Sequence, residues 1–181
     1  MKKIMVGIVL LSMFLFVGCS LGTNTPTKKS EEFLNRYKNL NDSVIKDLEL
    51  NAEREGFTKE DQKKAYIEII KTEYKNMTYK IDSEDTKEDI SNVKATIKVY
   101  NLYSIEDDSR KYLATHPEEF KTDNKYDNEK FIDYRLKQLK NAKEKISHTI
   151  TLQLKKVDGK WIVQNPDTET LQKLHGLYNS K

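Results

Sequence analysis

The chain has 181 residues, with 32 Lys and Arg against 29 Asp and Glu, and its formal net charge is +3. Without the first 18 residues, whose only charged side chains are Lys2 and Lys3, the net charge is +1, and this balance argues against a nucleic-acid-binding protein, which needs a basic face. The single cysteine excludes an intramolecular disulfide, so the domain must fold on its own apolar core.

The N-terminus combines positive charge with a short apolar run. Lys2 and Lys3 precede residues 4–17, which carry no charged side chain. This run is shorter than the ~20 apolar residues that a membrane-spanning helix needs, and it has the length of the apolar region of a secretory signal peptide. We therefore expect residues 1–18 to be a signal peptide that directs export.

The apolar run ends in the sequence LFVGCS at residues 15–20. It resembles the lipobox of bacterial lipoprotein precursors, in which a small residue, here Gly18, precedes the cysteine that receives lipid, here Cys19. Phe16 departs from the leucine usual at that position. The resemblance implies cleavage between Gly18 and Cys19 and a diacylglyceryl group on Cys19, which would anchor the protein at the outer face of the cell membrane. A chance cysteine near another cleavage site and a free thiol on an uncleaved anchor are the alternatives.

The residues after Cys19 divide into a tether and one domain. Residues 19–30 contain Gly, Pro and small hydroxylated residues without apolar periodicity, which predicts a flexible tether. Residues 31–181 then form a single domain. Many Lys, Asn, Ile and Tyr residues with few Ala, Gly and Pro are typical of a low-GC Gram-positive genome.

Apolar residues spaced by three and four predict two helices at the start of the domain. The first covers residues 31–55 and ends at Gly56. Thr58 is predicted to cap the second, which continues to about Tyr74. Together they are expected to form a helical hairpin.

The period then changes to two, which predicts strands at residues 77–81 and 93–103 joined through the acidic stretch 82–89. In the second strand Val93, Ala95, Ile97, Val99 and Tyr103 share the apolar face. Residues 104–120 suggest a short helix that ends at the sequence His116-Pro117.

The C-terminal third predicts a helix, a hairpin and a short final helix. Asp127 caps the helix, which runs to about residue 145. Residues 146–163 alternate strictly and contain the turn sequence Asp158-Gly159, which predicts a long hairpin. Asp167 or Thr168 then caps a helix that ends near Gly176.

This order, with LKKVDGKWIV at residues 154–163, resembles the NTF2-like, cystatin-like α+β fold of lipoproteins from Gram-positive bacteria. The resemblance implies a helical hairpin packed on a curved antiparallel sheet that forms a cone with a cavity. The helical tail from Asp167 onward departs from that pattern.

Alternation places His148 on the apolar face of its strand, where it could project into such a cavity with Ile150, Tyr103 and Trp161. A general base and a hydrogen-bonded core histidine are both open readings of His148. The three histidines share no metal-ligand spacing, and residues 82–89 lack the pattern of an EF-hand.

Two functions remain. The first is an anchored module that binds a small ligand or a protein partner, with no cofactor and no nucleic acid, and without enzymatic activity, since no catalytic motif is found. The alternative is a surface enzyme that uses His148 in an NTF2-like cavity. Fold alone does not decide between them.

Overall fold

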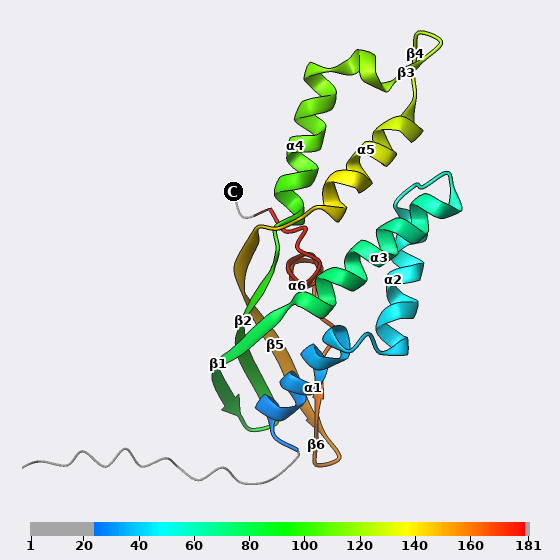
Figure 1. The fold of residues 1–181 in the computed structure, drawn as a ribbon. Helices are drawn as coiled ribbons and strands as arrows, with labels where there is room; N and C mark the ends of the chain where they lie inside the picture. The colour runs from blue at the N-terminus through cyan, green and yellow to red at the C-terminus, as the bar shows by residue number, and fades with distance from the viewer. Residues whose placement is uncertain (1–23, 180–181) are drawn as a thin grey trace, which may run out of the picture.

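The computed structural model describes residues 24–179 (Figure 1). The predicted signal peptide, the cleavage position at Gly18 and the lipid site at Cys19 lie outside the described residues. The elements are α1 (Pro26–Lys38), α2 (Asp42–Arg54), α3 (Glu60–Asn76), β1 (Thr78–Lys87), β2 (Ile90–Tyr100), α4 (Leu102–Thr115), η1 (Pro117–Phe120), β3 (Lys121–Thr122), β4 (Lys125–Tyr126), α5 (Asn128–Lys140), β5 (Lys145–Val157), β6 (Lys160–Val163) and α6 (Thr168–Leu174).

The main sheet is open, antiparallel and four-stranded, with strand order β1-β2-β5-β6. The inward residues Val93, Ala95, Ile97 and Val99 of β2 are completely buried, which confirms the alternation that the sequence predicts. The predicted closing hairpin is also confirmed, since β5 and β6 are joined by Asp158-Gly159, both with positive φ. The α+β class is therefore correct.

Two apolar clusters stabilise the domain. One lies between the sheet and the helices α1 and α6, where Leu34 and Leu174 are fully buried against β2 and β5. The other joins α2, α3 and α5 with the start of α4. Tyr37 packs against both clusters. Each fully buried leucine contributes about 1.5–3 kcal/mol relative to an exposed one, so these clusters dominate the stability.

The predicted tether is wrong for its last residues, because α1 already begins at Pro26. The Thr25 hydroxyl accepts a hydrogen bond from the Lys28 amide at 3.2 Å, and proline at the first helical position has the φ that a helix needs. Ser30 is completely buried. The segment between Cys19 and the domain is therefore shorter than predicted.

The single helix predicted for residues 31–55 is also wrong, since it is divided into α1 and α2. Leu40 adopts a left-handed conformation with φ 52°, and the Leu40 amide donates to the carbonyl of Tyr37 at 3.0 Å. This turn redirects the chain so that Val44 and Leu48 pack on α3 rather than on the sheet.

Further boundaries differ from the prediction, since β1 continues to Lys87 through most of the stretch predicted to be a turn, and α5 ends at Lys140. Lys59, not Thr58, is the N-cap of α3, and the Thr58 hydroxyl donates to Glu129 instead. Residues 102–103 belong to α4 rather than to a strand, because the Asn101 side chain accepts a hydrogen bond from the Ser104 amide and starts a helix there. Tyr103 thus leaves the sheet.

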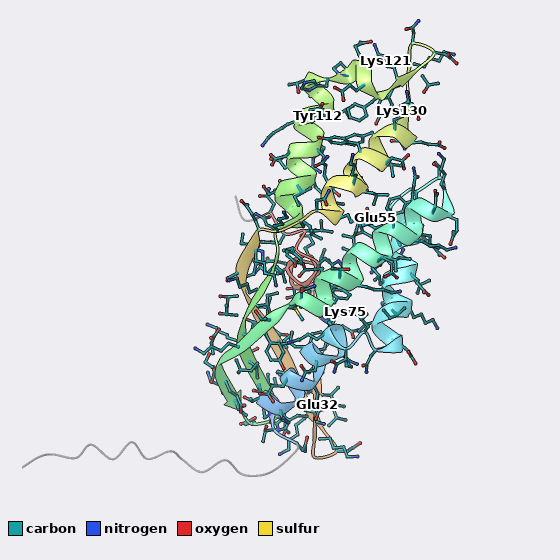
Figure 2. All side chains as sticks on the ribbon, viewed as in Figure 1. Glu32, Glu55, Lys75, Tyr112, Lys121 and Lys130 are labelled. Atoms are coloured by element: carbon teal, nitrogen blue, oxygen red, sulfur yellow. The ribbon has the colours of Figure 1, made fainter. Side chains whose placement is uncertain are left out.

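Residues 102–140, from α4 through α5, form an arm that extends away from the sheet (Figure 1). Tyr112, Lys121 and Lys130 all lie in its outer part (Figure 2). Tyr112 stacks on His116 and on Tyr134, with ring centroids 4.1 and 4.9 Å apart, and Phe120 packs edge-on against Phe131. The outer arm is thus stabilised by its own aromatic contacts.

Candidate functional site

A groove of about 700 Å³ lies between α3 and α5. Its lining includes apolar side chains from both helices, from the start of α4 and from the residues that follow α5: Ala65, Ile69, Leu102, Leu136, Leu139 and Ala142. Four of these, Ile69, Leu102, Leu136 and Leu139, are at most 8% exposed. The groove therefore has an apolar floor of the size that accommodates a small organic ligand.

Charged side chains of both signs surround this floor. The acids already have partners within the domain: Glu68 pairs with Lys71 at 2.8 Å, Asp61 accepts from the Gln62 amide, and Asp133 accepts from the Gln62 side chain. The lysines are Lys64, Lys137 and Lys140, and none forms an ion pair with another described residue. The groove therefore offers cationic groups beside an apolar surface.

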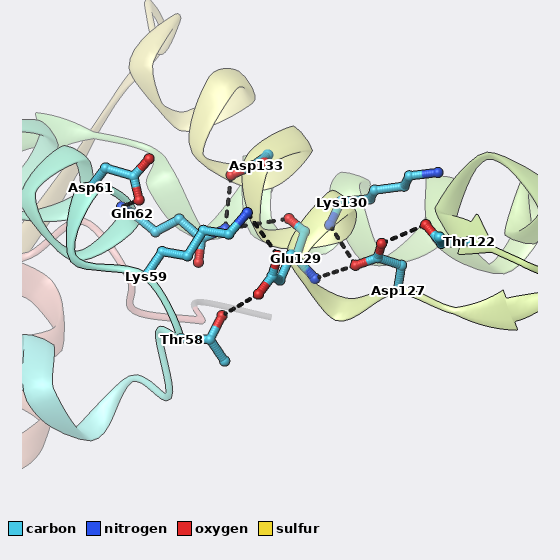
Figure 3. Close-up of polar contacts among 9 residues, drawn as sticks. All are labelled: Thr58, Lys59, Asp61, Gln62, Thr122, Asp127, Glu129, Lys130 and Asp133. Atoms are coloured by element: carbon cyan, nitrogen blue, oxygen red, sulfur yellow. Dashed lines mark hydrogen bonds and ion pairs between the residues drawn. The ribbon is translucent and has the colours of Figure 1, made fainter.

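A set of polar contacts, which we call the clasp, joins the start of α3 to the start of α5 (Figure 3). Lys59 pairs with Glu129 at 2.7 Å, and Thr58 donates to the same carboxylate at 3.2 Å. Gln62 is 3% exposed, and its Nε2 donates to Asp133 at 2.8 Å. Because Gln62 and Asp133 also line the groove, the clasp fixes the spacing of the two helices at this end.

Asp127 positions α5 for these contacts. Its carboxylate accepts hydrogen bonds from the amides of Glu129 and Lys130, and from the Thr122 hydroxyl at 2.6 Å (Figure 3). The bond from Thr122, followed by the amide donors, lowers the pKa of Asp127. This N-cap confirms the helix start that the sequence predicts.

The buried carboxyl of Glu73 lies where α3 meets the end of β2. Glu73 is 1% exposed, and its Oε2 accepts a hydrogen bond from the Tyr100 amide at 2.8 Å. Its Oε1 has no partner among the described residues. Burial raises the pKa of Glu73 to about 7, against the lowering effects of the Tyr100 amide and of Lys145. Glu73 is not among the residues that line the groove.

The second hollow, of about 260 Å³, lies between α2 and the end of α6. His175 lines it and packs on Tyr74, with ring centroids 5.8 Å apart. Burial lowers the pKa of His175 to about 4. The side chain is therefore neutral at physiological pH.

The four residues predicted to share a cavity, His148, Ile150, Tyr103 and Trp161, line neither hollow. Ile150 and Trp161 are part of the apolar cluster between the sheet and α1, whereas Tyr103 lies on α4. The helices α1 and α6 fill the inward face of the sheet, where a cone-shaped cavity was expected.

His148 itself is 7% exposed and packs edge-on against Tyr178 at 5.5 Å. Burial, followed by the charge of Lys173, lowers its pKa. Its Nε2 has no hydrogen-bond partner among the described residues. The charged group that acts on His148 is thus a cation, whereas a carboxylate is what usually orients a general base.

Within residues 24–179, no three His, Cys, Asp or Glu side chains come together as metal ligands would. No helix in the same range has the length and apolarity to cross a membrane.

The sequence did not reveal the groove, because its two walls are about 70 residues apart in the chain. Gln62 and Asp133, for example, are separated by 71 positions. The predicted inward faces of the two helices are largely correct, with Ile69 and Leu139 buried. Periodicity identifies such a face, but it does not tell whether the opposing helix closes over it.

These features describe an α+β domain with an open antiparallel sheet and a groove between two helices. The sequence matches no family model, and no curated protein matches it. Among solved structures, the presumed lipoprotein ycdA of Bacillus subtilis matches with a TM-score of 0.46 and 15% identity. The match covers 87% of this chain and 51% of that protein, so the chain spans about half its length. Similarity at this level assigns neither a family nor a function to this chain.

Proposed function

We propose that the chain is a lipoprotein anchored at the outer face of the cell membrane, and that its α3–α5 groove binds a small amphipathic molecule with an anionic head group. The observation that carries the binding role is an apolar floor that lies beside the unpaired lysines Lys64, Lys137 and Lys140. An apolar body would displace water from Ile69 and Leu136, and an anionic head would pair with the lysines.

We also propose that the protein binds its ligand without transforming it, and that it belongs among NTF2-like folds. The order of helices, antiparallel strands and closing hairpin supports the second point. The first is supported by the position of His148, outside both hollows and without an activating carboxylate. The enzyme alternative has no comparable observation in its favour.

The anionic fluorophore 1-anilinonaphthalene-8-sulfonate provides a test of the groove. Ala65 is exposed and lines the groove, so Ala65→Trp should fill it and reduce binding of the fluorophore at least about tenfold. Ala114→Trp makes the same change at an exposed position of α4 outside the groove and should leave binding unchanged. Equal affinities for the two variants would refute the proposed site.

The role of the lysines can be separated from that of the floor. Lys137→Gln combined with Lys140→Gln removes two of the three cationic groups. The affinity of the groove for the anionic fluorophore should then fall by roughly tenfold. The uncharged dye Nile red should bind almost as before, because Leu136 and Leu139 remain. If the affinities for both dyes fall equally, the lysines do not recognise an anionic head group.

The proposed anchor is tested separately by mass spectrometry of the protein expressed in a Gram-positive host. The mature chain should begin at Cys19 and carry the added mass of a diacylglyceryl group, and Cys19→Ser should abolish both. An unmodified Cys19 would refute anchoring and would leave the groove proposal intact.

A further inference from the structure

The turns β1–β2 and β5–β6 lie together at one end of the sheet, which we call the hairpin end (Figure 1). The amide of Lys156 donates to the carbonyl of Asp89 at 2.8 Å, which joins the two turns. Asn24, the first described residue, is bound to the same end. Its Nδ2 donates to the Gly159 carbonyl at 2.8 Å, and its Oδ1 accepts from the Trp161 amide at 2.9 Å.

The hairpin end carries an unusual concentration of exposed aliphatic side chains. Ile90, Val157 and Ile162 are 58%, 42% and 47% exposed, and they are three of the five large hydrophobic residues exposed in the described part of the chain. Lys155 pairs with Ile90 on one side and with Ile162 on the other. Directly paired residues share a face of the sheet, so the two isoleucines flank Lys155 on its outward face.

Lysines alternate with these aliphatic side chains. Lys87 pairs with Ile90, which extends the outward row across all four strands, and Lys160 pairs with Val157 beside that row. Neither lysine forms an ion pair within residues 24–179. The turn acids Glu88, Asp89 and Asp158 offset most of this positive charge. The character of the hairpin end is therefore amphipathic, with a small net charge.

The distance to the proposed lipid site is limited by the chain itself. Cys19 precedes Asn24 by five positions, and five residues span at most about 17 Å in any conformation. Because Asn24 is fixed to the β5–β6 turn, a lipid on Cys19 would bring the hairpin end within that distance of the bilayer.

We infer that the hairpin end is a membrane-contact surface, in which Ile90, Val157 and Ile162 insert at the boundary between head groups and acyl chains while Lys87, Lys155 and Lys160 lie at the head groups. This inference rests on the proposed lipid anchor. Lysine is suited to such a position because its apolar stem can lie along the aliphatic side chains while the ammonium stays in water.

The contact orients the domain and does not recruit it. The three side chains hold about eleven carbons, fewer than a single myristoyl chain, which alone gives only marginal membrane binding. Once Cys19 is anchored, the same contact becomes intramolecular and fixes which end faces the bilayer. The arm, which lies at the other end of the molecule from the turns, would then extend outward (Figure 1).

The test uses the full mature chain, lipidated at Cys19 and reconstituted in vesicles of phosphatidylcholine, with or without phosphatidylglycerol. The natural sequence has one cysteine, which the lipid occupies, so Val157→Cys can be labelled uniquely with the environment-sensitive fluorophore NBD. Tyr126→Cys is the control, because Tyr126 is 53% exposed in the outer arm.

We expect the label at position 157 to shift to the blue on vesicles and to be quenched by doxyl-labelled lipid at least about twofold more than the label at position 126. Both vesicle compositions should give this result, since the net charge of the hairpin end is small. Ile90→Asp should reduce the quenching at position 157, whereas Leu50→Asp, which changes another exposed aliphatic residue, on α2, should not.

Other results would overturn the inference in distinguishable ways. If the protein floats with the vesicles but both labels remain equally aqueous, the anchor is real and the contact is wrong. If the blue shift at position 157 rises with protein concentration in the absence of vesicles, the hairpin end binds a second copy of the chain instead of lipid. If the lipidated chain does not float, the anchoring proposal fails and the contact fails with it.

Discussion

At the scale of single residues, Glu73 is a buried carboxyl group in an environment that disfavours its charged form. A carboxylate that loses its hydration must gain hydrogen bonds in return, and Glu73 gains one, from the Tyr100 amide. Its second oxygen has no partner among the described residues. The result is a raised pKa, about 7, which makes the stability of the domain depend on pH near neutrality.

The sign of that dependence follows from proton linkage. Below pH 4.5 the Glu73 carboxyl is protonated in both the folded and the unfolded chain. Between pH 4.5 and 7 the unfolded chain releases this proton while the folded chain keeps it, so the stability falls across that range and the loss is complete once the pH has risen through 7. Glu73→Gln is neutral at every pH and should be more stable than the natural chain by roughly 3 kcal/mol at pH 8, but by little at pH 4.5.

Urea denaturation of the two proteins at pH 4.5 and pH 8 measures this difference. Glu68→Gln is the matched control, because Glu68 is exposed on the same helix. The stability of this variant should equal that of the natural chain at both pH values. A constant difference between Glu73→Gln and the natural chain would show that the buried carboxyl stays ionised.

At the scale of elements, short polar sequences decide where helices begin and end. Gly176 ends α6 with φ 69°, and a Cβ at this position would lie 2.2 Å from the Tyr100 carbonyl oxygen. The Gly176 carbonyl in turn accepts from the Tyr103 amide at 2.8 Å. This glycine therefore joins the C-terminal helix to the junction of β2 and α4.

Two glycine variants separate backbone conformation from this close approach. Gly56→Ala places alanine at φ 74° in open space, so it should cost only the ~1–2 kcal/mol of a left-handed alanine. Gly176→Ala adds a backbone clash to the same conformational cost and should lose at least about 2 kcal/mol more. The urea midpoints of the two variants measure this difference. Equal losses of stability would mean that the chain near Tyr100 moves aside at little cost.

The elements also show what a single sequence can and cannot predict. The β5–β6 hairpin is predictable because strict alternation and the Asp-Gly turn agree. The break at Leu40 is harder, since the apolar period continues through it and only Asn39, Asn41 and Asp42 signal a turn. Thr25-Pro26 is a helix start whose signal is masked by the tether-like composition around it.

The candidate site was less predictable than the fold. His148 alternates correctly to the inward face, but α6 and the following Tyr178 pack against that face. Conversely, Lys64 and Lys137 look like ordinary solvated charges in the sequence. Only the structure shows that they line a groove between α3 and α5. Side-chain periodicity is a local property, whereas the openness of a helix pair depends on contacts that are distant in sequence.

At the scale of the whole molecule, the domain divides into a sheet body and an arm that differ in how they are stabilised. The body contains completely buried strand residues such as Val93 and Ile97. The outer arm depends on ring contacts among its own residues, Tyr112 and Phe120 among them, whereas the clasp and the apolar residues of α5 link it to α3. We therefore expect the arm to open locally at a lower free energy than the sheet.

Glu129→Ala tests this link, because it removes the partner of Thr58 and Lys59 while the N-cap bonds of Asp127 to the α5 backbone remain. The Lys59–Glu129 pair is exposed to solvent, so its loss should change the midpoint of global urea unfolding very little. The same loss concentrated on local opening corresponds to roughly a fivefold faster hydrogen exchange in the first turns of α5. Exchange in β2 and β5 should not change.

Glu118→Ala, which removes a local pair with Lys121 in the same arm, serves as the control and should leave α5 exchange unaltered. If the two variants accelerate exchange equally, the clasp does not hold α5 against α3 and does not set the spacing of the groove.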